Sequence, residues 1–138
     1  MEQPQAQQQP QPKRGALLMA NQIGEVTVVN FLTTQVLDEM NVHQLGEELN
    51  NLVDKEGKTK LVLNFSKVKY LSSAVLGKLI SLNKKVNGIK GRIGLCGINP
   101  EIMKVFKITQ LDKMIPIFES EEDAVKGIAK PGLFGRYL

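Results

Sequence analysis

The sequence has little of the chemistry that stabilises small secreted folds or metal-bound folds. Its 138 residues include one cysteine, one histidine and no tryptophan. A single cysteine cannot form a disulfide within the chain, and one cysteine with one histidine cannot supply the three or four ligands of a zinc site. The sequence therefore excludes a disulfide scaffold and a structural zinc site.

Long apolar segments are also missing. The longest uninterrupted apolar run is residues 16–20, far below the roughly 18 residues that span a bilayer. No apolar stretch follows the first few residues, where a signal peptide would carry one. We therefore expect a cytoplasmic protein without membrane insertion.

Aromatic residues make up only 5% of the chain, so few rings are available to stack on unpaired bases. A formal net charge of +4 and an isoelectric point near 9.2 would suit a nucleic acid. The lysines fall mainly at predicted helix ends and in loops, however, where cations favour the C-terminal end of a helix dipole. We therefore expect no nucleic-acid partner.

The chain does have enough apolar material for one domain. Apolar residues make up 42% of it, and a chain of this length buries about two thirds of its unfolded surface. Residues 1–14 are rich in glutamine and proline and cannot repay the entropy of being ordered, so we predict a disordered tail. Apolar periodicity predicts one compact domain over 16–130, followed by a C-terminal extension at 131–138.

The first half of that domain predicts a hairpin, a helix and a buried strand. Two short runs rich in β-formers, 16–22 and 25–32, are separated by a turn that includes Gly24. Asn41 is placed to cap a helix whose apolar residues recur at helical spacing over the next three turns. Residues 60–65 carry three successive aliphatic side chains, which is typical of a central strand in a parallel sheet.

The second half continues the alternation of helices and strands. A second helix is predicted to begin with a capping serine, Ser72 or Ser73, and to end at Gly88. Residues 92–96 form the next predicted strand. Pro100 then suits the first turn of a third helix.

The last two predicted elements complete an α/β fold. Residues 114–118 form a strand that Pro116 confines to a sheet edge, because proline cannot donate to the ladder. Ser120 precedes three acidic residues, which indicates the capped start of a final helix. The order of elements predicts a single-domain α/β fold with a mixed sheet of about five strands and about four helices.

No motif for catalysis or cofactor binding is complete. Glycines recur between 88 and 97, but they surround a turn and a strand, so the dinucleotide-binding fingerprint is absent. A Gly-Lys pair resembles the end of a P-loop, yet Leu79 stands where a hydroxyl should hold magnesium. Cys96 has only His43 as a histidine activator, and we interpret the pair as a core thiol and a surface histidine. We expect no enzyme, no cofactor and no metal.

The most distinctive segment, at 67–82, reads KVKYLSSAVLGKLISL. The adjacent hydroxyls of Ser72 and Ser73 stand at a predicted helix start, where free N–H groups and the helix dipole favour a phosphate. The same hydroxyls also suit a helix cap, and one serine can have both roles. Ser73 and Ser72 are therefore the candidate phosphorylation sites.

This segment and its neighbours resemble the STAS domain family, which includes the bacterial anti-sigma factor antagonists. The resemblance covers about residues 16–128 and implies the α/β fold of that family. Each piece alone is unspecific, but their combination in this order is specific. The pieces are the strand and corner at 61–71, the Leu-Gly pair at 76–77, the segment 92–118 and the acidic helix start at 120–123.

In the family this corner usually reads Asp-Ser-Ser/Thr-Gly-Leu-Gly, and a kinase-type anti-sigma factor phosphorylates the second hydroxyl. An ungapped alignment puts Ser72 at the Asp, Ser73 at the first Ser, Ala74 at the phosphoacceptor and Val75 at the first Gly. Sliding the alignment by one residue would rotate the apolar stripe that begins at Leu76 by about 100° away from the core. The resemblance therefore implies a switch that is lost, or displaced to Ser73.

The resemblance implies a non-enzymatic regulator. It would sequester a kinase-type anti-sigma factor, as a monomer or a homodimer, and so free a sigma factor for transcription. Val75 in place of glycine is expected to add a branched side chain where the partner's backbone approaches. The implied partner-binding residues are Thr33, Thr34, Ser72, Ser73, Ala74, Lys78 and Asn99.

A second interpretation stays open from the same resemblance. The chain would then be a STAS scaffold or ligand-sensing module that binds a nucleotide, a lipid or another STAS chain. A scaffold is expected to form a large oligomer, whereas an antagonist is expected to bind its partner as a monomer or a small dimer.

Overall fold

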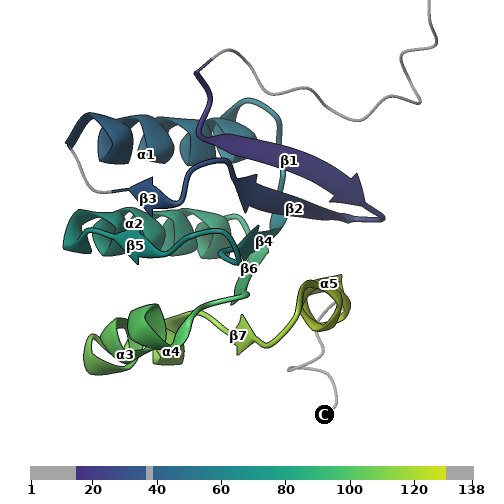
Figure 1. The fold of residues 1–138 in the computed structure, drawn as a ribbon. Helices are drawn as coiled ribbons and strands as arrows, with labels where there is room; N and C mark the ends of the chain where they lie inside the picture. Colours follow the sequence, from purple (N-terminus) through teal and green to yellow (C-terminus); the bar gives the residue numbers. More distant parts are fainter. Residues whose placement is uncertain (1–14, 37–38, 130–138) are drawn as a thin grey trace, which may run out of the picture.

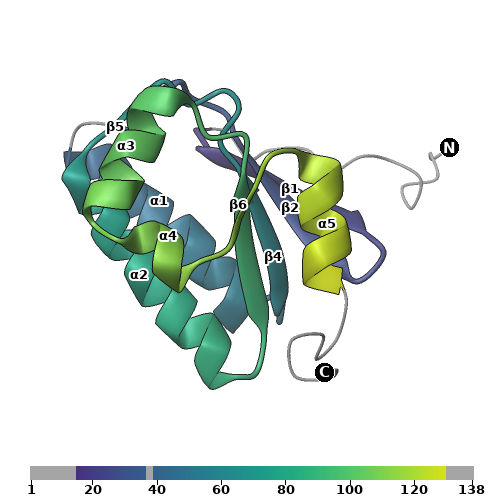
Figure 2. The ribbon, with the colours of Figure 1, turned by 90° about the horizontal axis from the view of Figure 1, so that it is seen from below.

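The computed structural model describes residues 15–36 and 39–129. Within these ranges it confirms the predicted α/β class: helices cover both faces of a mixed five-stranded sheet (Figures 1 and 2). The predicted tail at 1–14 and extension at 131–138 lie outside the described residues.

The sheet has the order β1-β2-β4-β6-β7. As predicted, the first two strands form an antiparallel hairpin, whose turn contains Gly24 at a φ of 61°. The other strand pairs are parallel, with the predicted buried strand in the centre and the strand after Pro116 at the edge. The strands are β1 (Leu18–Ile23), β2 (Val26–Phe31), β4 (Lys60–Asn64), β6 (Arg92–Cys96) and β7 (Ile117–Phe118).

The sheet separates two apolar cores. The larger core packs four helices against one face, and the smaller core packs α5 against the other (Figure 2). In β4 the side chains alternate between the two, because Leu61 and Leu63 face the larger core while Val62 faces the smaller one. The four helices are α1 (Glu39–Asp54), α2 (Ser73–Gly88), α3 (Pro100–Ile108) and α4 (Leu111–Met114), and α5 is Glu121–Ala129.

Two predicted element starts are wrong. The strand predicted at 114–118 begins only at Ile117, where β7 starts, and Met114 belongs to α4. Leu111 and Ile115 are both buried at helical spacing, and the ladder begins only after Pro116, which has no N–H to donate. Helix α1 begins at Glu39, so Asn41 lies inside the helix and is not its cap.

A second, two-stranded sheet was not predicted. It pairs β3 (Gln35–Val36) with β5 (Tyr70–Leu71) in parallel. Each strand has two residues, too few to show the alternation that identifies strands in a sequence.

Helix α5 packs closely on the sheet through glycines. A Cβ atom on Gly94 would lie 2.9 Å from Cε1 of Phe118, and one on Gly127 would lie 2.6 Å from Cε2 of the same ring. The Phe118 ring therefore fills the space that the two glycines leave between β6 and α5.

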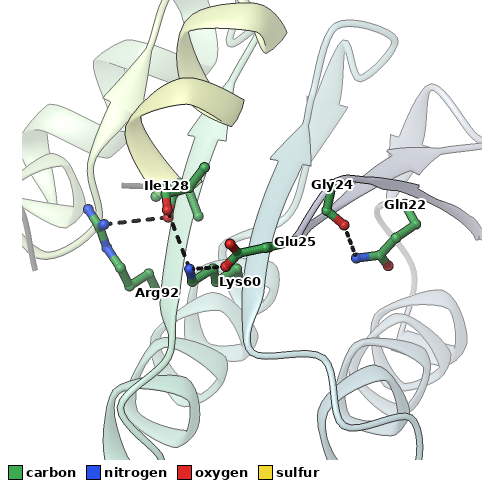
Figure 3. A network of polar contacts seen from close by, with 7 residues as sticks. Gln22, Gly24, Glu25, Lys60, Arg92 and Ile128 are labelled. Atoms are coloured by element: carbon green, nitrogen blue, oxygen red, sulfur yellow. Dashed lines mark hydrogen bonds and ion pairs between the residues drawn. The ribbon is translucent and has the colours of Figure 1, made fainter. Parts of the chain in front are cut away.

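Cations hold the far end of α5. Lys60 Nζ lies 2.6 Å from Glu25 Oε1 and 3.4 Å from the carbonyl oxygen of Ala129. Arg92 donates from Nη1 to the carbonyl oxygen of Ile128 at 3.4 Å (Figure 3). Hydrogen bonding to the Lys60 ammonium and its charge lower the pKa of Glu25. These cations satisfy carbonyl groups at the negative end of the helix.

We predict opposite effects for two glycine substitutions. Gly94→Ala should lower the free energy of unfolding by about 1–3 kcal/mol, because the ring it would push against is held on its other side by Gly127. Gly77→Ala in α2 should raise it by about 0.5–1 kcal/mol, because its Cβ would meet nothing within 4 Å. Urea unfolding measures both, and equal effects would contradict the packing described for α5.

Candidate partner-binding site

The candidate site lies where the chain turns from β4 into α2. The amide of Phe65 donates to the carbonyl of Cys96 at 2.8 Å, and the amide of Ser66 donates to Asn64 Oδ1 at 2.9 Å. Asn64 also donates from Nδ2 to Glu121 Oε1 at 2.8 Å. Three bonds thus fix the start of this turn against β6 and α5.

The loop after β2 holds the next part of the turn. The amides of Lys69 and Tyr70 both donate to the carbonyl of Thr34, at 2.8 and 3.2 Å. Thr33 is half-buried and Thr34 is exposed. The structure therefore brings the predicted threonines beside the segment that leads into α2. Strands β3 and β5, which follow the two segments, lie together at one end of the fold (Figure 1).

Asn99 joins the loop after β6 to the same segment. Its Oδ1 accepts from the amide of Ile102 at 2.8 Å and caps α3. Its Nδ2 donates to the carbonyls of Val68 and Lys69, at 3.2 and 3.5 Å. Asn99 thus positions the turn, and the loops after three parallel strands meet at one edge of the sheet.

Ser72 is the N-cap residue of α2, but its side chain forms no capping bond. Its backbone is extended, with φ −87° and ψ 162°, and its carbonyl accepts from the amide of Val75 at 3.0 Å. The Ser72 Oγ atom is buried and has no hydrogen-bond partner among the described residues. The predicted cap is therefore right in position and wrong in its side-chain bond.

The first turn of α2 has two exposed residues followed by two buried ones. Ser73 and Ala74 are exposed, whereas Val75 is fully buried and Leu76 is 6% exposed. The expectation that Val75 meets a partner is therefore wrong, because its branched side chain packs in the larger core.

Lys78 lies one turn further along α2, and its side chain packs against α1. A Cβ on Gly46 would lie 2.9 Å from Lys78 Cδ, so the aliphatic stem of the lysine occupies the space that this glycine leaves. Lys78 is half-buried, and its ammonium forms no ion pair within the described ranges. It therefore borders the site between the two helices.

Sequence reasoning missed one exposed residue at the site, Tyr70. Its side chain is 59% exposed although it belongs to β5. An aromatic residue directly after two nearby lysines was the available signal, but nothing in the sequence shows which side chains of a two-residue strand face solvent.

The structure gives no support to a cysteine nucleophile. Cys96 packs in the smaller core beneath α5, and burial, with a contribution from Glu121, raises the pKa of its thiol to about 11. His43 is exposed on α1, on the opposite face of the sheet, with Nε2 3.4 Å from Glu47 Oε2 (Figure 2). The two groups cannot act together.

Among residues 15–36 and 39–129, no three His, Cys, Asp or Glu side chains are grouped so as to hold a metal ion. Nor does any helix in those ranges have the length and apolar character needed to cross a bilayer.

The family model for the STAS domain matches residues 18–124. The chain belongs to the STAS domain family. The BtrV protein of Bordetella bronchiseptica, designated an anti-sigma factor antagonist, is 33% identical over 89 residues, which cover 64% of this chain and 76% of BtrV. An anti-sigma F factor antagonist of Paenibacillus polymyxa is 21% identical over 89 residues, with the same coverage of 64% and 76%.

Solved structures share the fold. TM1081 of Thermotoga maritima, also designated an anti-sigma factor antagonist, matches with a TM-score of 0.71 and 20% identity over 82% of this chain and 95% of that chain. The phosphorylated form of the Bacillus protein SpoIIAA matches with a TM-score of 0.63 and 19% identity over 80% of this chain and 98% of that chain. Its unphosphorylated form is similar at a TM-score of 0.62 and 18% identity, over 80% and 96%.

We predict that Cys96 is unreactive in the folded protein. Raising the thiol pKa from 9.0 to about 11 lowers the thiolate fraction at pH 8 about a hundredfold. Iodoacetamide should therefore modify Cys96 more than tenfold faster in urea than in the native state, as mass spectrometry can measure. Because the unfolded thiol ionises first, the free energy of unfolding should fall as the pH rises from about 9 to 11. Equal rates in urea and buffer would contradict the burial.

Proposed function

We propose that this STAS protein is an anti-sigma factor antagonist. It binds a kinase-type anti-sigma factor through the start of α2 and the adjoining loops, and so frees a sigma factor for transcription. It acts by binding alone and is not itself an enzyme. The observation that carries the proposal is the surface formed by Thr33, Thr34, Ser73, Ala74 and Lys78, in a chain whose relatives are designated anti-sigma factor antagonists.

The geometry of α2 supports the register that the family resemblance gave. Leu76 and Leu79 face the core. Sliding the alignment by one residue would put the apolar positions of the family about 100° around the helix from this buried stripe. In the unshifted register the exposed Ala74 occupies the acceptor position of the family. We propose that this protein has lost the usual phosphorylation switch and stays competent to bind its partner, because alanine cannot carry the phosphate charge.

Adding charge at the start of α2 should weaken partner binding. We expect Ser73→Glu to raise the Kd for the kinase-type anti-sigma factor at least tenfold, about 1.4 kcal/mol, because it puts a carboxylate on the exposed first residue of the helix. Titration calorimetry with the purified kinase-type anti-sigma factors of the source organism measures this change.

Ser81→Glu is the matched control for that experiment. Ser81 is also exposed on α2, two turns from Ser73, so the substitution adds the same charge away from the site. The proposal predicts a Kd within about twofold of the parent for Ser81→Glu. Unchanged binding by Ser73→Glu would show that the start of α2 is not the interface.

A lost switch predicts that no phosphate accumulates at the start of α2. Phosphosite mapping of the protein from its own cells should find Ser72 and Ser73 unmodified, while an added Ala74→Ser substitution restores an acceptor hydroxyl at an exposed position. A stoichiometric phosphate on Ser73 that Ser73→Ala abolishes would instead show that the switch is displaced.

The scaffold interpretation gives a different result in the same assays. A STAS scaffold or ligand-sensing module would elute as a large oligomer and would bind a nucleotide, a lipid or other STAS chains in place of a kinase-type anti-sigma factor. Such an oligomer, unaffected by Ser73→Glu, would replace the antagonist proposal.

A further inference from the structure

Charge is distributed very unevenly along the chain. Residues 57–100 contain nine lysine and arginine residues and no aspartate or glutamate, whereas the rest of the sequence contains nine basic and fourteen acidic residues. The basic segment includes β5 and the whole of α2, which carry the proposed docking surface.

Some of these cations have structural roles on the opposite side of the fold. Lys60 pairs with Glu25 at 2.6 Å, and Lys85 pairs with Asp54 at 2.7 Å. Arg92 holds the end of α5, as described above. These contacts account for three of the nine cations.

Three other lysines surround the start of α2. Lys67 and Lys69 are exposed in the turn after β4, and Lys78 is half-buried beside α1. Within the part of the chain that the structure describes, none of the three forms an ion pair. Their charges are therefore not neutralised by this part of the chain.

The backbone presents these side chains in a fixed arrangement. The amides of Lys69 and Tyr70 donate to Thr34, and the carbonyl of Lys69 accepts from Asn99. Tyr70 directly follows the exposed Lys69 in sequence and is itself 59% exposed. A rigid aromatic residue with neighbouring cations loses little conformational entropy on binding and is typical of the centre of a protein interface.

We infer that this basic corner, defined as Lys67, Lys69, Tyr70 and Lys78, docks on an acidic surface of the anti-sigma factor partner. The inference rests on the proposed function and adds the chemistry of the surface that recognises it. Carboxylates of the partner pair with the lysines, and the Tyr70 ring packs on an apolar residue among them. A protein fits this corner better than a nucleic acid, because stacking of successive bases uses several rings and the corner has Tyr70 alone, while the adjoining Ala74 and Gly77 allow close approach.

The test compares two charge reversals of equal size in the full-length protein. Lys67→Glu with Lys69→Glu changes the basic corner, while Lys55→Glu with Lys113→Glu changes two exposed lysines elsewhere on the chain. Binding to the purified kinase-type anti-sigma factors of the source organism is measured between about 50 and 300 mM NaCl. Circular dichroism confirms that each variant is folded.

We expect the corner variant to raise the Kd at least tenfold at low salt and to bind with a weaker salt dependence than the parent. The control variant should stay within about threefold of the parent. Tyr70→Ala should raise the Kd about fivefold or more without changing the salt dependence, because it removes packing and not charge.

Four results would overturn the inference. Equal losses in both charge-reversal variants would show that only net charge matters. If the corner variant binds with the same Kd and the same salt dependence as the parent, the lysines lie outside the interface. The proposed function would still stand in that case if Ser73→Glu weakens binding. Failure of every kinase-type anti-sigma factor to bind the parent would reject both. A labelled single-stranded DNA that binds only when the corner is intact, with partner binding unaffected, would assign the corner to nucleic acid.

Discussion

The parallel pairing of β4 with β2 on one side and with β6 on the other is the constraint on which the rest of this structure depends. Leu61 pairs with Thr27 and Ile93, and the same register continues to Asn64. The carboxyl ends of the three strands therefore meet at one edge of the sheet. The loops that leave them are then close enough for Thr34 and Asn99 to hydrogen-bond to the segment before α2.

Packing of α2 in the larger core fixes which of its residues are exposed to solvent. Val75, Leu79 and Val86 are fully buried against the sheet and α1, so the rotation of the helix is fixed. Ser73 and Ala74 face solvent as a consequence. The proposed docking surface acts by binding and uses no catalytic group.

Much of the fold could be predicted, because long elements leave strong patterns. The central strand, the edge strand, the start of α3 at Pro100 and the cap of α5 follow from side-chain chemistry that the sequence shows directly. The β3–β5 sheet could not be predicted, since its hydrogen bonds join segments far apart in sequence. The burial of Val75 was also missed, because its neighbours Ser73 and Ala74 gave no apolar pattern that would show where the helix turns inward.

The most direct test of the account is hydrogen exchange of the protein alone and with the proposed kinase-type anti-sigma factor partner, followed by mass spectrometry. The account predicts added protection in peptides that cover 33–34 and 66–78, with little change in α5, which packs on the other face of the sheet. Protection confined to α3, α4 or α5 would contradict it, because the partner would then bind away from the edge where the three loops meet.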